Sequence, residues 1–205
     1  MVDRLKTQNF GFWSSNTVEP KRQYKFLVTI PNFAPFLVTK CGRPSLKIGE
    51  TPHKFLNHTF YYPGTVEWNS LAMTFVDPGD GLGGESDVTH LLYNKILESG
   101  YRSPSNYASI EKNTVGKGLA TYAFNEIKIQ TLKTKLGSAG GGSGPSNLNN
   151  LTDIAETWTL KNAWATDVKW GDLDYSGDAL LQLDVTFRYD FAQLHAGGNA
   201  TSVPE

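Results

Sequence analysis

The sequence predicts a mainly β protein, an antiparallel β-sandwich or barrel with one short flanking α-helix. Apolar and polar residues alternate from residue 181 to residue 191, and shorter runs alternate at residues 24–30 and 66–76. A period of two is typical of strands with one buried and one wet face. Only residues 88–96 place apolar side chains at convincing helical spacing.

The first predicted strand is residues 24–30, YKFLVTI, in which every second side chain is apolar. Residues 36–40, FLVTK, follow after a turn bounded by Pro31 and Pro35. We expect the two strands to pair as a hairpin.

The next segment, residues 53–62, is aromatic and extended, and Pro63–Gly64 marks a predicted turn. The strand that follows should bury one side and expose the other. Its apolar side holds Leu71, Met73 and Phe75, and the opposite side holds Ser70, Ala72 and Thr74.

The last predicted strand, LLQLDVTFRYDF, has the most regular alternation in the chain. Its apolar face is expected to hold Leu181, Leu183, Val185, Phe187, Tyr189 and Phe191. Its polar face is expected to hold Gln182, Asp184, Thr186, Arg188 and Asp190. Such a sheet has one solvated side.

One amphipathic helix is predicted to cover a face or an opening of the strand layer. Val88, Leu91, Leu92 and Ile96 share one side at helical spacing. Ser86 or Asp87 suits the N-cap, and Gly100 is placed to end the helix.

The chain reads as a single domain spanning residues 1–205. Two further extended stretches, residues 122–132 and 154–160, flank a glycine-rich excursion at about residues 133–152. An N-terminal extension at about residues 1–20 and a C-terminal tail at about residues 192–205 complete the predicted organisation.

A glycine-rich loop raises the question of nucleotide binding, because Gly79, Gly81 and Gly84 spell G-x-G-x-x-G. A dinucleotide site needs a buried parallel strand before these glycines and a βαβ unit after them. Here the preceding strand alternates like an antiparallel one, and carboxylates surround the loop. We therefore interpret the glycines as a strand-to-helix turn.

Other candidate sites also favour structural interpretations, so we expect no catalytic residue, cofactor or metal. Residues 172–178, DLDYSGD, resemble the start of a calcium loop, but Leu183 stands where the bidentate glutamate would be. His53 and His58 are five apart on an extended stretch and should point to opposite faces. The chain has no G-x-S-x-G, H-E-x-x-H or Walker motif.

Net charge, cysteine content and the lengths of apolar runs argue against several classes of protein. A net charge of −1 argues against a surface that grips polyanions throughout. The single cysteine, Cys41, cannot form an intrachain disulfide and fits folding in a reducing compartment. No apolar run is long enough to predict a signal peptide or a membrane span.

Two stretches carry a family resemblance when they are taken together. Residues 60–78, FYYPGTVEWNSLAMTFVDP, contain a glycine turn, a tryptophan and a strand. Residues 156–191 run through a strand, a W-x-T turn, an acidic hairpin and a closing strand. With RQYKFLVTI and CGRPSL placed before them, their order and spacing resemble the tail tube protein family of contractile-tailed (myovirus) bacteriophages.

The resemblance implies a ring-forming, tail-tube-like fold. It further implies six-membered rings that stack into a hollow tube within the virion, assembled in the bacterial cytoplasm. The implied partners are identical copies, the tail sheath, and the baseplate and tail-terminator proteins, with phage DNA passing through without specific binding. The chain departs from the family in its glycine-rich excursion, in residues 101–118 and in its tail.

The resemblance also suggests which residues face the bore. Sliding DNA requires a wall that is not rich in lysine and arginine, because each neutralised phosphate adds affinity. We expect the polar sides of two strands to line the lumen: Gln182, Asp184, Thr186, Arg188, Asp190, Ser70, Ala72 and Thr74.

Several alternatives stay open at this stage. The chain could form a specialised initiator, baseplate or terminal ring, or the tube of a related contractile secretion or injection system. A carbohydrate-binding sandwich could use Trp158, Trp164 and Trp170 to stack sugars. An enzyme is disfavoured because no group of residues fills acid, base and nucleophile roles.

Overall fold

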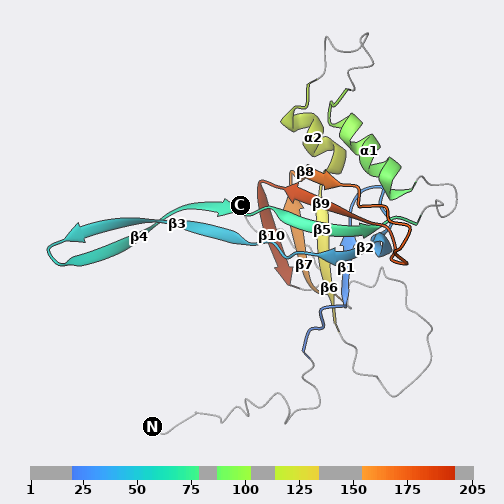
Figure 1. The fold of residues 1–205 in the computed structure, drawn as a ribbon. Coiled ribbons are helices and arrows are strands. Elements are labelled where there is room, and N and C mark those ends of the chain that lie inside the picture. The colour runs from blue at the N-terminus through green and yellow to red at the C-terminus, as the bar shows by residue number, and fades with distance from the viewer. Residues whose placement is uncertain (1–19, 79–86, 103–113, 134–153, 197–205) are drawn as a thin grey trace, which may run out of the picture.

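The computed structural model describes residues 20–78, 87–102, 114–133 and 154–196, and the observations below concern these residues. They form two four-stranded antiparallel sheets, a separate two-stranded hairpin and two α-helices (Figure 1). The predicted mainly β, antiparallel fold is confirmed. The G-x-G-x-x-G loop and the glycine-rich excursion lie outside the described residues.

Each sheet draws its strands from distant parts of the chain. The first has the order β1 (Phe26–Thr29), β6 (Ile127–Leu132), β7 (Ile154–Lys161) and β10 (Phe191–Ala196). The second has the order β2 (Val38–Cys41), β5 (Leu71–Val76), β9 (Gln182–Arg188) and β8 (Trp164–Lys169). All neighbouring strands are antiparallel.

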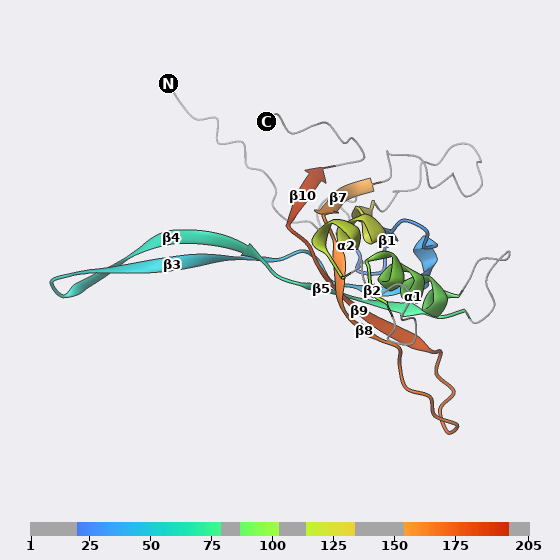
Figure 2. The same cartoon turned by 90° about the horizontal axis from the view of Figure 1, so that it is seen from above.

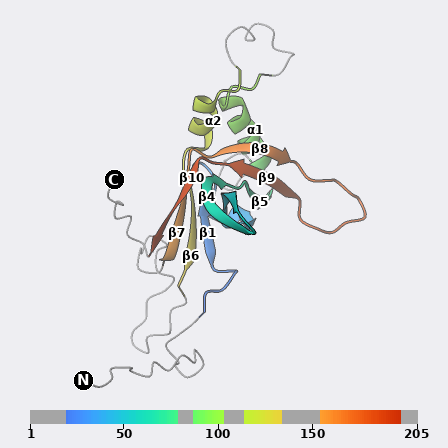
Figure 3. The ribbon, with the colours of Figure 1, turned by 90° about the vertical axis from the view of Figure 1, so that its left-hand side faces the viewer.

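The core lies where the two sheets face each other. Strands of one sheet run across those of the other, as Figures 1 and 3 show. The predicted apolar faces of β5 and β9 are confirmed as buried: Leu71, Met73, Phe75, Leu183, Val185 and Phe187. Phe75 packs against Phe33 with ring centroids 5.8 Å apart.

The predicted pairing of the first two strands is wrong, because β1 and β2 belong to different sheets. Between them, an isolated bridge from Ile30 to Phe33 and the 3₁₀ helix η1 (Pro35–Leu37) carry the chain across the core. Apolar alternation shows which side of a strand is buried but does not identify its partner strand, so sequence proximity was a poor guide to pairing.

The last predicted strand is in fact two strands in two sheets. It ends at Arg188, turns a corner at Tyr189 and Asp190, and continues as β10. Residues 192–196, predicted as part of a tail, therefore pair with β7. The chain turns the same corner between β7 and β8 at Asn162, whose φ of 56° suits asparagine.

Two helices lie side by side next to β8 (Figures 1 and 2). The predicted helix is confirmed as α1 (Val88–Glu98), with the Asp87 carboxylate accepting the His90 N–H at 2.8 Å. Gly100 follows it at a φ of 103°. A second helix, α2 (Lys117–Phe124), was not predicted, and its Phe124 ring packs on Phe187 in the core.

The hairpin of β3 (Leu46–Phe55) and β4 (His58–Trp68) projects far from the sandwich (Figure 1), and we call it the arm. The turn predicted at Pro63–Gly64 is wrong, because the arm turns at Leu56 and Asn57. Gly64 instead permits a close approach of the two strands where their register shifts, since a Cβ there would lie 3.2 Å from the Gly49 carbonyl oxygen.

One buried carboxylate ties the segment before β1 and the β2–β3 connection to the first sheet. Glu156 on β7 accepts from the Lys21 ammonium, the Arg43 guanidinium and the Thr131 hydroxyl. Burial alone would raise the pKa of Glu156, but these donors outweigh it and hold the pKa below its ordinary value. None of the helices in the described residues is long and apolar enough to cross a membrane.

We expect Glu156→Gln to lower the free energy of unfolding by about 1 to 2 kcal/mol at neutral pH, because it removes a buried charged acceptor. A lowered carboxyl pKa stabilises the fold above the pKa of the unfolded state, and this contribution is lost as pH falls. The difference between wild type and variant should therefore shrink as the pH falls below about 5. Denaturant titrations across this range measure it.

The matched control is Glu67→Gln, which removes an exposed carboxylate paired with Arg188. Its effect should stay below about 1 kcal/mol at every pH. A Glu156→Gln difference that is constant from neutral to acid pH would contradict the role given to the charge.

Candidate assembly surfaces

The structure brings most of the predicted lumen residues together on the outer face of the second sheet. Cross-strand pairs on this face join Ala72 to Thr186 and Thr74 to Asp184. The Thr74 hydroxyl donates to the Asp184 carboxylate at 2.7 Å. Gln182 follows on the same side of β9 and is exposed. We call this surface the polar face.

The polar face also carries charged residues that sequence reasoning missed. Lys40 on β2 lies opposite Thr74, and Asp167 and Lys169 on β8 lie opposite Thr186 and Asp184. Positive and negative side chains are therefore interspersed rather than segregated. The register of β2 and β8 against their neighbours is what places them there, and the sequence pattern does not reveal it.

The remaining predicted lumen residues lie at the margins of this face. Arg188 ends β9, and its guanidinium is 3.0 Å from the Glu67 carboxylate on the arm. Ser70 precedes β5 and is exposed. Asp190 lies at the corner after β9, where it binds Lys117 and Asn162, each at 2.8 Å.

In each four-stranded sheet of the described residues, the two outer strands present an unpaired backbone edge. β1 and β10 border the first sheet, and β2 and β8 border the second, so each has one neighbour. Edge strands expose rows of N–H and C=O groups that can pair with another chain. Each four-stranded sheet therefore has two edges at which another chain could pair.

The arm presents a second unpartnered surface. Nearly all of its residues are exposed. One face of its outer half is aromatic and holds Phe55, Phe60, Tyr62, His53 and His58, with Thr51. A two-stranded ribbon alone is at best marginally stable in water.

The predicted orientation of the two histidines is wrong. His53 pairs with Phe60 across the arm, and His58 pairs with Phe55, so the two histidines share one face. The sequence argument assumed one continuous strand, and the turn at Leu56–Asn57 reverses the chain between them.

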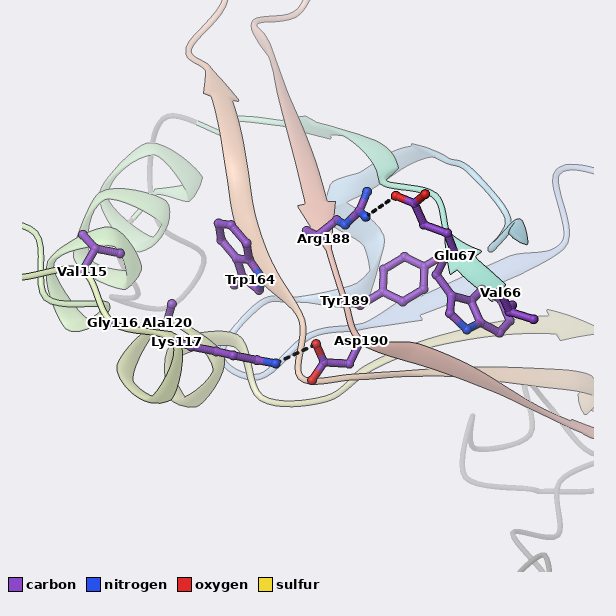
Figure 4. A pocket seen from close by; sticks show the side chains of 11 residues that line it. Val66, Glu67, Val115, Gly116, Lys117, Ala120, Trp164, Arg188, Tyr189 and Asp190 are labelled. Atoms are coloured by element: carbon purple, nitrogen blue, oxygen red, sulfur yellow. Dashed lines mark hydrogen bonds and ion pairs between the residues drawn. The ribbon is translucent and has the colours of Figure 1, made fainter. Parts of the chain in front are cut away.

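A hollow of about 510 Å³ opens where the arm meets the sandwich (Figure 4). We call it the socket. It is lined by Val66, Glu67, Trp68, Val115, Gly116, Lys117, Ala120, Trp164, Arg188, Tyr189 and Asp190. Trp68 and Tyr189 contact each other in its wall with ring centroids 6.0 Å apart.

The charges of the socket are paired with each other. Figure 4 shows two ion pairs at its rim, Arg188 with Glu67 and Lys117 with Asp190. The hydrogen bond from Lys117, followed by that from Asn162, holds the pKa of Asp190 below its ordinary value. The walls between these pairs are aromatic and aliphatic, which suits an uncharged apolar group.

The loop between β8 and β9 forms a second projection (Figures 2 and 3). Leu173, Tyr175 and Leu180 are exposed on it. Asp174 accepts from the backbone N–H of Ser176 at 2.9 Å and from its hydroxyl at 2.7 Å, and the backbone bond is the main cause of its lowered pKa. The DLDYSGD segment thus contains an Asx-type turn.

Chemistry at the other candidate residues is limited. Burial raises the pKa of the Cys41 thiol to about 12, so it is almost entirely protonated at neutral pH. Among the described residues, no three His, Cys, Asp or Glu side chains gather closely enough to hold a metal.

Comparison with solved structures identifies chains of similar fold. One belongs to the PVC sheath/tube terminator of an extracellular contractile injection system in the extended state (14% identity, 87% of this chain and 99% of that chain, TM-score 0.54). Another belongs to the anti-feeding prophage baseplate (16%, 87% and 97%, TM-score 0.54). A third belongs to the PVC sheath-tube complex (17%, 86% and 92%, TM-score 0.52).

No protein-family model matches the sequence, and no curated protein matches it either. At such low identities the structural likeness establishes a shared fold. The fold implied by the tail-tube resemblance is therefore confirmed, and it is one found in chains of contractile injection systems. The assignment to a myovirus stays a prediction.

Proposed function

We propose that this chain is a structural subunit that polymerises as stacked six-membered rings, forming the inner tube of a contractile phage tail. The observation that carries the proposal is the combination of unpaired strand edges on both sheets with one outward polar face. Edge pairing between identical copies would join their sheets into a closed wall. The polar face would then line a bore through which DNA passes.

The charges on the polar face support a bore that does not retain DNA. Arg188 is neutralised by Glu67, and Lys169 lies opposite Asp184. A cation that is already paired, as Arg188 is, neutralises an approaching phosphate less fully, so fewer counterions leave the DNA and little affinity is gained. The sheath, the baseplate and the terminator proteins are the partners that a tube of this kind requires.

A related assembly is the second candidate. The similar chains come from a tube terminator, a baseplate and a sheath-tube complex of extracellular systems. A terminal or initiating ring, or the tube of a contractile injection system, would use the same edges and the same polar face. A non-enzymatic role follows in each case.

Electron microscopy of the concentrated protein tests assembly directly. We expect annuli or short stacked tubes, because the strand edges and the arm that are exposed in the described residues can pair with other copies. Light scattering across a range of protein concentrations should show a matching rise in mass. A protein that stays monomeric at every concentration would contradict the proposal.

Cysteine labelling of assembled particles tests which surface lines the bore. In a Cys41→Ser background, Asp184→Cys and Thr186→Cys should react with small maleimides but slowly with reagents too large to enter the bore. The control is Lys128→Cys, on the first sheet, where Lys128 is exposed. It should react with both reagents. Equal rates for large reagents at residues 184 and 128 would refute the assignment.

A further inference from the structure

We propose that the tip of the arm, Phe55 and Leu56, docks in the socket of a second copy of this chain. The inference deepens the proposed function, on which it rests, by naming both halves of one contact between subunits. Four observations carry it: the conformation of Leu56, the composition of the socket, the distribution of charge and the distance between tip and socket.

Leu56 is an unexpected residue at its position. It is the first of two turn residues, its φ is 52°, and its side chain is 86% exposed. Glycine or asparagine is favoured at positive φ, and a bulky side chain there is strained. A leucine at this turn strains the backbone and exposes apolar surface to water. We therefore explain the side chain by a contact outside the subunit.

The socket matches such a side chain in size and chemistry. Its volume of about 510 Å³ exceeds that of a leucine and a phenylalanine side chain together. Trp68, Trp164 and Tyr189 provide aromatic walls. Its four charged side chains are satisfied by each other, so they do not require a charged ligand.

Charge distinguishes the arm tip from the other exposed projection. The β8–β9 loop also offers apolar side chains, but Asp172, Asp174 and Asp178 accompany them. Those carboxylates would approach Glu67 and Asp190 at the socket rim. The tip carries Lys54 and no carboxylate between residues 54 and 60, so it enters without like-charge repulsion.

The length of the arm makes the contact intermolecular. The socket includes Val66 and Trp68 at the base of the arm, and the tip lies at its far end (Figure 1). A strand of ten residues spans about 33 Å, so a chain cannot fill its own socket. A tip and a socket on different surfaces give a head-to-tail contact that repeats from copy to copy.

Leu56→Gly separates docking from folding. Glycine relieves the positive φ, so the melting temperature should stay equal or rise. The concentration at which the protein assembles, measured by light scattering, should rise about tenfold or more through the lost apolar contact. Leu173→Gly is the matched control at an equally exposed leucine of the other projection, and its assembly should be unchanged. The reverse pattern would overturn the proposal in favour of the β8–β9 loop.

Disulfide trapping tests whether the arm tip of one copy lies in the socket of another. In a Cys41→Ser background, chains with Leu56→Cys are mixed with chains carrying Val115→Cys at the socket rim (Figure 4). Mild oxidation should yield a mixed dimer on non-reducing gels, and Tyr175→Cys mixed with Val115→Cys should not. Annular particles without the mixed dimer would overturn tip docking and leave the proposed tube intact. A mixed dimer without annuli would support tip docking and contradict the tube.

Discussion

The structure depends on a constraint of β-sheets: backbone groups and apolar faces at a sheet margin need partners. In the described chain, the outer strands of both four-stranded sheets have none, and neither do the outer edges and the two faces of the arm. The sandwich itself meets this requirement for its inner faces, because its two sheets, α1 and α2 bury a continuous core. Within the described residues, the fold therefore separates a well-packed body from margins that these residues leave uncovered.

This separation explains where the polar groups lie. The inner faces of β5 and β9 are apolar and buried, and their outer faces carry threonine, aspartate and glutamine in register. Glu156 anchors the segments that lead into β1 and β3 at one end of the first sheet, whereas Asp190 binds α2 at the opposite corner. These ionic contacts thus tie the segment before β1, the β2–β3 connection and α2 to the body. The assembly that we propose would need such fixed attachments, because small errors accumulate from copy to copy.

Much of the fold could be predicted from local sequence patterns, but the candidate assembly surfaces could not. Alternation predicted the buried sides of β5 and β9, and the Asp87 cap and Gly100 predicted the bounds of α1. The corner at Tyr189 was missed because alternation continues through it, although the strand changes sheets. The socket was missed because its walls come from four separate segments, which only the tertiary structure assembles. The prediction at Pro63–Gly64 failed because a proline–glycine pair usually signals a turn, whereas this glycine lets two paired strands approach closely where their register shifts.

Hydrogen exchange of the backbone amides in β3, β4 and β8, followed as protein concentration increases, shows whether identical copies cover these margins. Exchange should be fast in dilute protein and should slow as the protein assembles, while amides in β5 and β9 stay protected throughout. Exchange in the arm and in β8 that is independent of concentration while particles form would contradict coverage of these margins by identical copies.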